Sequence, residues 1–159
     1  MKKLWNIPDM PVWSISTCGS EGTPNMNICS YMTPVSMQPK KYVIAVYPNT
    51  QTHTNIQSSK YVIAQLLSQE QAVLVRRLGK KSSLHFPKKM QSILNTTGVD
   101  NALHFLPQSI GYFLLKKETA LLKAGDHDIA IFSVEKTVYL NPLKNVLTLT
   151  YLREKNIIA

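Results

Sequence analysis

Eight short apolar runs, separated by turn-forming residues, constrain the fold of this 159-residue chain more than any other feature of its sequence. Two of them, YVIAVY (42–47) and YVIAQLL (61–67), are almost continuously apolar and rich in Val, Ile and Tyr, as is typical of strands covered on both faces. The others are VWSIST (12–17), NMNICSYM (25–32), IGYFLLKK (110–117), TALLKA (119–124), DIAIFSVEKTVYL (128–140) and VLTLTYL (146–152). Short strands at this spacing predict a mainly β fold, either a closed barrel or a sandwich.

Helices are predicted to be few and short. The segment 69–78 begins with a capping box, Ser68 with Gln71, and Gly79 stands at the expected stop. Its apolar residues form a stripe that we expect to pack over an open end of the barrel: Ala72, Leu74, Val75 and Leu78. Shorter helices are predicted to begin near Thr52 and near Pro87. The loop CGSEGTP (18–24) is predicted to join the first two strands as a hairpin.

Length and composition indicate one soluble domain over residues 1–159, because no linker or internal repeat divides the chain. Hydrophobic residues make up 44% of it and charged residues 17%. The N-terminal MKKLWNIPDMP lacks the apolar region of a signal peptide, and no window approaches a membrane span, so we expect no membrane partner and a cytoplasmic location. The two cysteines, Cys18 and Cys29, lack metal-type spacing to any histidine, which favours free thiols and no metal site.

The charge of the chain is strongly basic, at +9 with a pI near 9.6, which favours an anionic partner. Six basic residues gather in RRLGKKSSLHFPKK: Arg76, Arg77, Lys80, Lys81, Lys88 and Lys89. The segment is either an anion-binding surface or a solvated helix end. A nucleic-acid-binding barrel is an alternative function, but single-strand binders interleave aromatic residues, and this segment holds only Phe86.

The segment NMNICSYMTPVSMQP (25–39) is unusual for a strand, because it carries an amide, hydroxyls and a thiol before two prolines. Alternation places Met26, Ile28, Ser30 and Met32 on one face and Asn27, Cys29, Tyr31 and Thr33 on the other. Because Pro34 and Pro39 cannot donate to a sheet, TPVSMQP is predicted to be irregular, with free backbone groups. The segment suits a flat heteroaromatic ligand, or it is an edge strand that ends in a loop.

A second polar segment, PNTQTHTNIQSS (48–59), surrounds the predicted start of a short helix with hydroxyls and amides. Such groups at a helix N-terminus make a phosphate site without glycines. An ordinary N-cap needs only one of them.

Together with AGDHDIAIFSVEK (124–136), these segments resemble the flavin reductase-like family, which includes the flavoredoxins, from about Pro11 to Tyr139. The resemblance implies an FMN-binding split β-barrel with a Greek-key arrangement and a few short helices. The segment along the isoalloxazine and ribityl chain corresponds to Asn27, Ser30, Tyr31, Met32, Thr33, Pro34, Val35 and Ser36. The phosphate segment corresponds to Thr50, Gln51, Thr52, His53 and Asn55, and the nicotinamide side to His127 in the turn Gly125–His127.

The implied activity is hydride transfer from NADH or NADPH to FMN, with FAD as the alternative flavin. A flavoredoxin-type electron carrier is the neighbouring alternative within the family. His127 is either a catalytic acid, a residue that positions the nicotinamide, or a structural turn residue. Family members often carry a basic residue where this chain has Thr50, and Lys80, Lys81 and Lys88 are candidates to replace it.

The resemblance also implies partners. It predicts a homodimer with FMN near the interface, and a downstream monooxygenase or other electron acceptor. The residues that can supply apolar contact area are Trp5, Trp13, Met26, Met32 and Met37, although core packing explains the same residues.

Overall fold

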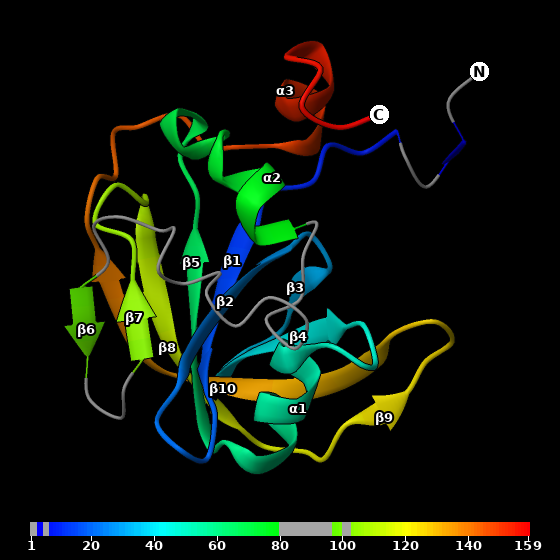
Figure 1. Ribbon diagram of the computed structural model, residues 1–159, viewed down its shortest axis with the longest axis vertical. Coiled ribbons are helices and arrows are strands. Elements are labelled where there is room, and N and C mark those ends of the chain that lie inside the picture. The colour runs from blue at the N-terminus through cyan, green and yellow to red at the C-terminus, as the bar shows by residue number, and fades with distance from the viewer. Residues whose placement is uncertain (1–2, 5–6, 80–96, 100–102) are drawn as a thin grey trace.

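The computed structural model describes residues 3–4, 7–79, 97–99 and 103–159 (Figure 1). Its main element is an antiparallel sheet with the strand order β2-β1-β5-β8-β10-β4-β3, and β9 pairs with β10 beside this path. The strands are β1 (Trp13–Cys18), β2 (Pro24–Cys29), β3 (Met32–Met37), β4 (Lys40–Val46), β5 (Tyr61–Leu66), β8 (Gly111–Lys117), β9 (Leu122–Lys123) and β10 (Asp128–Tyr139). A separate pair is formed by β6 (Thr97–Val99) and β7 (Leu103–Phe105). The predicted mainly β fold is therefore confirmed.

The sheet curls because its two edge strands are consecutive in the chain. β2 and β3 lie at opposite ends of the pairing order, yet only Ser30 and Tyr31 connect them. Three Cα steps span at most about 11 Å, whereas seven strands in a flat sheet would hold the edges about 29 Å apart. The edges must therefore approach each other, and the curled sheet of Figure 1 is a split barrel.

The connection between β2 and β3 corrects two sequence-based expectations. The strand predicted over 25–32 ends at Cys29, and the predicted irregular segment forms β3, an edge strand paired with β4. The register shifts between Pro34 and Ser36, which leaves Val35 as a β-bulge. Since the alternation stops at the connection, Met32 packs in the barrel core with Cys29, while Met26 packs in the cluster beneath α2. The prediction that Met26 and Met32 share a face was wrong.

Short helical segments lie at the ends of the barrel, and those bounded within the described residues are α1 (Gln51–Ser58), the 3₁₀ turn η2 (Gln69–Gln71), α2 (Leu74–Gly79) and α3 (Leu149–Glu154). α1 confirms the helix predicted near Thr52. The helix predicted over 69–78 is divided into η2 and α2, and Gly79 is the last residue of α2 rather than the residue after it. The predicted capping box of Ser68 and Gln71 is present, and the Ser68 N–H donates to Gln71 Oε1 at 3.0 Å. The helix predicted near Pro87 lies outside the described residues.

The predicted apolar stripe is buried as expected. Ala72, Val75 and Leu78 pack with Met26, Leu67 and Leu152 in a cluster that joins η2 and α2 to the upper end of the barrel. A second cluster fills the barrel itself, with Ile15, Ile44, Val62, Leu115 and Phe132 among its members.

The segment predicted as a strand over 146–152 is mostly the helix α3, so that prediction was wrong. Thr148 caps the helix by accepting the Tyr151 N–H at 3.3 Å, and Asp9 Oδ1 accepts the Thr150 N–H at 2.9 Å. These contacts satisfy N–H groups that a helix start leaves unpaired. Of the strand predicted over 119–124, only Leu122–Lys123 forms β9.

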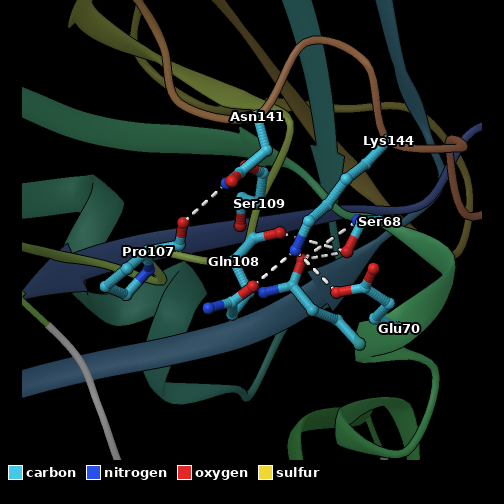
Figure 2. A network of polar contacts seen from close by, with 8 residues as sticks. Ser68, Glu70, Pro107, Gln108, Ser109, Asn141 and Lys144 are labelled. Atoms are coloured by element: carbon cyan, nitrogen blue, oxygen red, sulfur yellow. Dashed lines mark hydrogen bonds and ion pairs between the residues drawn. The ribbon is translucent and has the colours of Figure 1, made fainter.

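A polar network, here called the Lys144 network, ties three loops together at the α2 end of the barrel (Figure 2). Lys144 Nζ donates to Glu70 Oε2 at 2.6 Å and to Gln108 Oε1. The Asn141 amide donates to the carbonyls of Pro107 at 2.7 Å and Ser109 at 2.8 Å. The Ser68 hydroxyl donates to the Gln108 carbonyl at 3.0 Å, which joins this network to the start of η2.

Candidate functional site

The start of α1 is formed by a turn that only certain residues can make. Asn49 has φ of 59°, in the left-handed region that Asn tolerates better than most residues. This turn brings Thr50 to the N-cap, where its hydroxyl accepts the His53 N–H at 3.2 Å and donates to the Tyr47 carbonyl at 2.8 Å. At the other end of α1, Lys117 Nζ donates to the Ile56 carbonyl at 2.5 Å and the Gln57 carbonyl at 2.8 Å. Both ends of this helix are therefore anchored.

The inner face of α1 carries a buried polar network. The Asn25 amide donates to the hydroxyls of Thr17 and Thr52, each at 3.0 Å, and the Asn55 amide donates to Thr17 at 3.0 Å. Thr52, Asn25 and Asn55 are each only 2% exposed. The Gln51 amide donates to Asn55 Oδ1 at 2.7 Å. The side chains of Thr52 and Asn55 thus hold the helix against β1 and β2.

His53 connects the first turn of α1 to the first residue of β10. Its Nε2 lies 2.7 Å from Asp128 Oδ2, and the two side chains are only 12% and 14% exposed. The register of β10 places Asp128 opposite Val46 at the end of β4. This contact joins residues that are 75 positions apart in the chain.

His127 lies beside Asp128 and is surrounded by aromatic rings from two other segments. Its ring centroid is 3.9 Å from that of Tyr47 and 5.1 Å from that of Tyr31. Its Nδ1 lies 2.8 Å from Asp126 Oδ1, and this hydrogen bond lowers the pKa of the Asp126 carboxyl. Gly125, with φ of 102°, makes the preceding turn as the sequence predicts.

The segment after β2 presents most of its side chains to the surface. Tyr31 and Val35 are each 51% exposed, Thr33 and Pro34 are also exposed, and Ser30 and Ser36 are half-buried. Met32 is the exception, because its side chain is in the core. On β2, Asn27 Oδ1 is buried without a hydrogen-bond partner among the described residues. No hydrogen bond from the described residues therefore compensates for removing the Asn27 oxygen from water.

Three segments that are distant in sequence therefore meet at one place, here called the α1 corner: the first turn of α1, the pair Tyr31 and Tyr47, and the turn Asp126–Asp128. A model of the flavin reductase like domain matches residues 9–156, nearly the whole chain. The chain belongs to the flavin reductase like domain family.

Solved structures share the fold of this flavin reductase like domain. A candidate oxidoreductase from Sinorhizobium meliloti 1021 superimposes with a TM-score of 0.78 at 14% identity, over 91% of this chain and 48% of the other, so this chain spans about half of that protein. The NADH:FAD oxidoreductase SgcE6 of Streptomyces globisporus gives a TM-score of 0.80 at 16% identity, over 91% of this chain and 83% of the other.

A third similar structure is the styrene monooxygenase flavin reductase SMOB of Pseudomonas putida S12. It gives a TM-score of 0.74 at 15% identity, over 93% of this chain and 90% of the other. Identities this low show the fold alone. No sequence among the curated proteins matches the chain.

Sequence reasoning missed several residues of the α1 corner in this flavin reductase like domain. From the sequence, Asp128 fits a turn residue as well as a general acid, and Tyr47 is predicted only as part of a strand. Asn25 and Lys117, which anchor α1 beside this corner, have no predicted role beyond their strands. A possible signal was Asp128 itself, a carboxylate directly after the histidine of the Gly-Asp-His turn. The pairing of Asp128 with His53 depends on the register of β10 and β4, which the sequence does not reveal.

The remaining site predictions have separate outcomes. Of the basic residues in segment 76–89, the structure describes Arg76 and Arg77, and Arg76 Nη2 donates to the Asn156 carbonyl at 2.9 Å. Lys80, Lys81, Lys88 and Lys89 lie outside the described residues.

Cys18 and Cys29 are free, and burial raises the pKa of the Cys29 thiol to about 12. The described part of the chain holds no cluster of His, Cys, Asp and Glu that suits a metal ion. Within the same part, no helix is long and apolar enough to cross a membrane.

Proposed function

We propose that this flavin reductase like domain, residues 1–159, binds FMN and transfers a hydride to it from NADH or NADPH. The observation that carries the proposal is the α1 corner, where the segments expected for the phosphate, the flavin ring and the nicotinamide meet. FMN supplies the redox chemistry when bound, since its N5 accepts the hydride. The chain's own residues therefore have to bind, orient and exclude water rather than act as nucleophiles.

The residues along β2 and β3 fit the ring and ribityl chain. The buried, unpartnered Asn27 Oδ1 is an acceptor for an N–H or hydroxyl of the flavin. Ser30, Thr33 and Ser36 offer hydroxyls, and the bulge at Val35 interrupts the pairing of β3 with β4. Since the Met32 side chain is buried in the core, it would contribute only its backbone.

The phosphate would lie at the first turn of α1. An eight-residue helix with its N-terminus near the surface favours an anion there through its backbone N–H groups and its dipole. Thr50 and Gln51 flank this position, and His53 is close to it. Because the Thr52 and Asn55 hydrogen bonds point inward, these residues would support the phosphate site by holding the helix, and Thr52 would contact the phosphate through its backbone.

His127 would orient the nicotinamide. An ionised Asp126 can only accept a hydrogen bond, so His127 Nδ1 must carry the proton in their 2.8 Å contact. In the neutral ring, Nε2 is then an acceptor that suits the carboxamide N–H of a nicotinamide. Packing against Tyr31 and Tyr47 restricts the direction of the ring.

The ligands found with similar solved structures support this choice. SgcE6 has been solved with NAD and FAD fragments, HpaC with NADP+, and the Thermus thermophilus relative is an FMN-binding protein. Because these proteins differ in the nucleotide and flavin named with them, NADH, NADPH, FMN and FAD are all candidate ligands of this chain. The name of the styrene monooxygenase reductase supports a downstream monooxygenase as one acceptor of the reduced flavin.

A homodimer that covers the flavin is part of the proposal, with β3 as the contact surface. Of the apolar residues considered for it, Trp13, Met26 and Met32 belong to the core, Trp5 lies outside the described residues, and Met37 is 81% exposed. Val35 and Met37 on β3, together with Tyr31 just before this strand, make an exposed apolar edge. Sedimentation at micromolar concentration should give twice the 17.9 kDa mass of the chain, and a monomer with flavin bound would contradict the dimer.

The deciding experiment is a titration of the purified protein with FMN and riboflavin, followed by anaerobic stopped-flow bleaching with NADH and with NADPH. FMN should bind at least 10-fold more tightly than riboflavin, because a charge-assisted contact contributes about 1.5 to 3 kcal/mol. His127→Ala should keep FMN but bleach about 10- to 100-fold more slowly.

Each unfavourable outcome of this experiment has a distinct meaning. Equal affinities for FMN and riboflavin would refute the phosphate site. FMN binding without bleaching by either nucleotide would identify an electron carrier instead of a reductase. An unchanged rate of bleaching in His127→Ala would show that this histidine has only a structural role.

A further inference from the structure

We propose that His53 and Asp128 are a positioning pair that couples the phosphate end of the site to its nicotinamide end. This inference rests on the proposed function and adds to it a means by which one ligand affects the other. Neither residue needs to touch the nicotinamide for this role.

The pair joins the two elements that carry the two ends. His53 lies in the first turn of α1, where the phosphate would bind, and Asp128 begins β10 directly after His127. Their contact is 2.7 Å long, and both side chains are largely shielded from water. A short, shielded contact of this kind holds its partners more firmly than an exposed surface ion pair does.

The pair also completes a closed ring of contacts. From His53, the 2.7 Å contact leads to Asp128, and the chain leads from there to His127. The centroid of the His127 imidazole lies 3.9 Å from that of the Tyr47 ring. The Tyr47 carbonyl accepts the Thr50 hydroxyl at 2.8 Å, and the same hydroxyl accepts the His53 N–H at 3.2 Å. Each end of the site is therefore connected to the other by two routes, one polar and one through aromatic packing.

A closed ring of this kind predicts reciprocal effects. A phosphate that fixes the first turn of α1 also fixes His53. Because His53 holds Asp128, and Asp128 directly follows His127, the phosphate also restricts the direction of the His127 ring. By linkage, whatever loosens Asp128 must also weaken phosphate binding. A residue pair that merely stabilised the fold would weaken the binding of FMN and riboflavin equally.

The test compares variants of both residues in FMN and riboflavin titrations of the ligand-free protein. The variants are Asp128→Ala, His53→Phe, which keeps a ring of similar size but cannot make the ion pair, and their combination. We expect each single variant to weaken FMN binding about 10-fold and riboflavin binding less than 2-fold. The double variant should bind FMN no more weakly than the worse single variant, because both remove the same contact.

Conservative and distant variants serve as controls. Asp128→Asn keeps an oxygen that can accept from His53 Nε2, so its FMN affinity should stay within about 3-fold of wild type. Glu70→Ala removes one member of the 2.6 Å pair with Lys144 at the other end of the barrel and should leave FMN affinity unchanged. If Asp128→Ala does not fold, Asp128→Ser, whose shorter side chain cannot reach Nε2, replaces it.

Hydride transfer gives the reciprocal measurement. With FMN saturating, His53→Phe should slow anaerobic bleaching by about 10-fold, although His53 lies at the phosphate end. The inference is overturned if Asp128→Ala leaves FMN affinity unchanged, if it weakens FMN and riboflavin equally, or if the effects of the two substitutions multiply. It is overturned equally if His53→Phe bleaches at the wild-type rate. Failure of the wild type to bind FMN would instead refute the proposed function.

Discussion

The α1 corner and the Lys144 network are both polar, and both join segments far apart in the chain. They differ in whether nearby polar groups are all hydrogen-bonded within the protein. In the Lys144 network, Lys144, Asn141 and Ser68 donate to oxygens of neighbouring loops, several of them backbone carbonyls (Figure 2). In the α1 corner, Tyr31 is half exposed, and the buried Asn27 Oδ1 on the adjoining strand has no partner among the described residues. The polar groups of the Lys144 network are used within the protein, whereas the strand beside the α1 corner retains an acceptor that the described residues do not use.

Strand β2, whose Asn25 binds α1 beside this corner, carries two asparagines in different surroundings. Asn25 and Asn27 lie two residues apart on the same face of β2, yet Asn25 donates to two hydroxyls and Asn27 Oδ1 has no described partner. The difference indicates that Asn25 supports α1, whereas Asn27 carries an acceptor that the described part of the fold does not use. Three substitutions test this division, in order of decreasing expected effect.

Asn25→Ala should cause the largest loss of stability. It leaves the buried Thr52 hydroxyl without the donor that it now has at 3.0 Å, and it removes one of the two amides that donate to Thr17, which keeps the Asn55 amide. Two lost buried hydrogen bonds and the space left behind should lower the free energy of unfolding by about 2 to 4 kcal/mol. Urea unfolding of the ligand-free protein measures this, and a loss below about 1 kcal/mol would show that the network does not support α1.

Asn27→Ala should have the opposite effect, with little loss of stability and a measurable loss of FMN affinity. Because Asn27 Oδ1 is already without a described partner, the free energy of unfolding should change by less than about 1 kcal/mol. FMN affinity should fall about 5- to 10-fold, equivalent to about 1 to 1.4 kcal/mol. Unfolding and fluorescence titrations on the same preparation measure both. Strong destabilisation with unchanged FMN affinity would make Asn27 a structural residue and remove the contrast with Asn25.

Lys144→Met should have the smallest effect. The Glu70 side chain of this pair is 64% exposed, so solvent screening limits its contribution to about 0.2 to 1 kcal/mol of unfolding free energy. FMN affinity should not change, because the Lys144 network lies at the α2 end of the barrel. A fall in FMN affinity comparable to that of Asn27→Ala would show that the two ends are not independent.

Local patterns predicted much of the fold. Runs of Val, Ile and Tyr indicated the strands, the CGSEGTP loop indicated the first hairpin, and Gly125 indicated a turn before His127. These features depend on residues close together in the chain, whose conformational preferences are readable locally. Where two structures fit the same pattern, the prediction failed. VLTLTYL alternates like a strand, but contacts from Asp9 and Thr148 make its second half a helix.

What the sequence by itself determined is therefore most strands of the main sheet, the polar segments and the family to which they point. What only the tertiary structure decided is the role of each polar side chain. Thr52 and Thr50 lie in one hydroxyl-rich segment, yet the first is buried against Asn25 and the second caps the helix near the surface. His53 meets Asp128 only because β10 pairs with β4 and α1 follows that strand. Local preference is encoded by neighbours in the chain, whereas the partner of a polar group depends on which distant segments the curled sheet brings together.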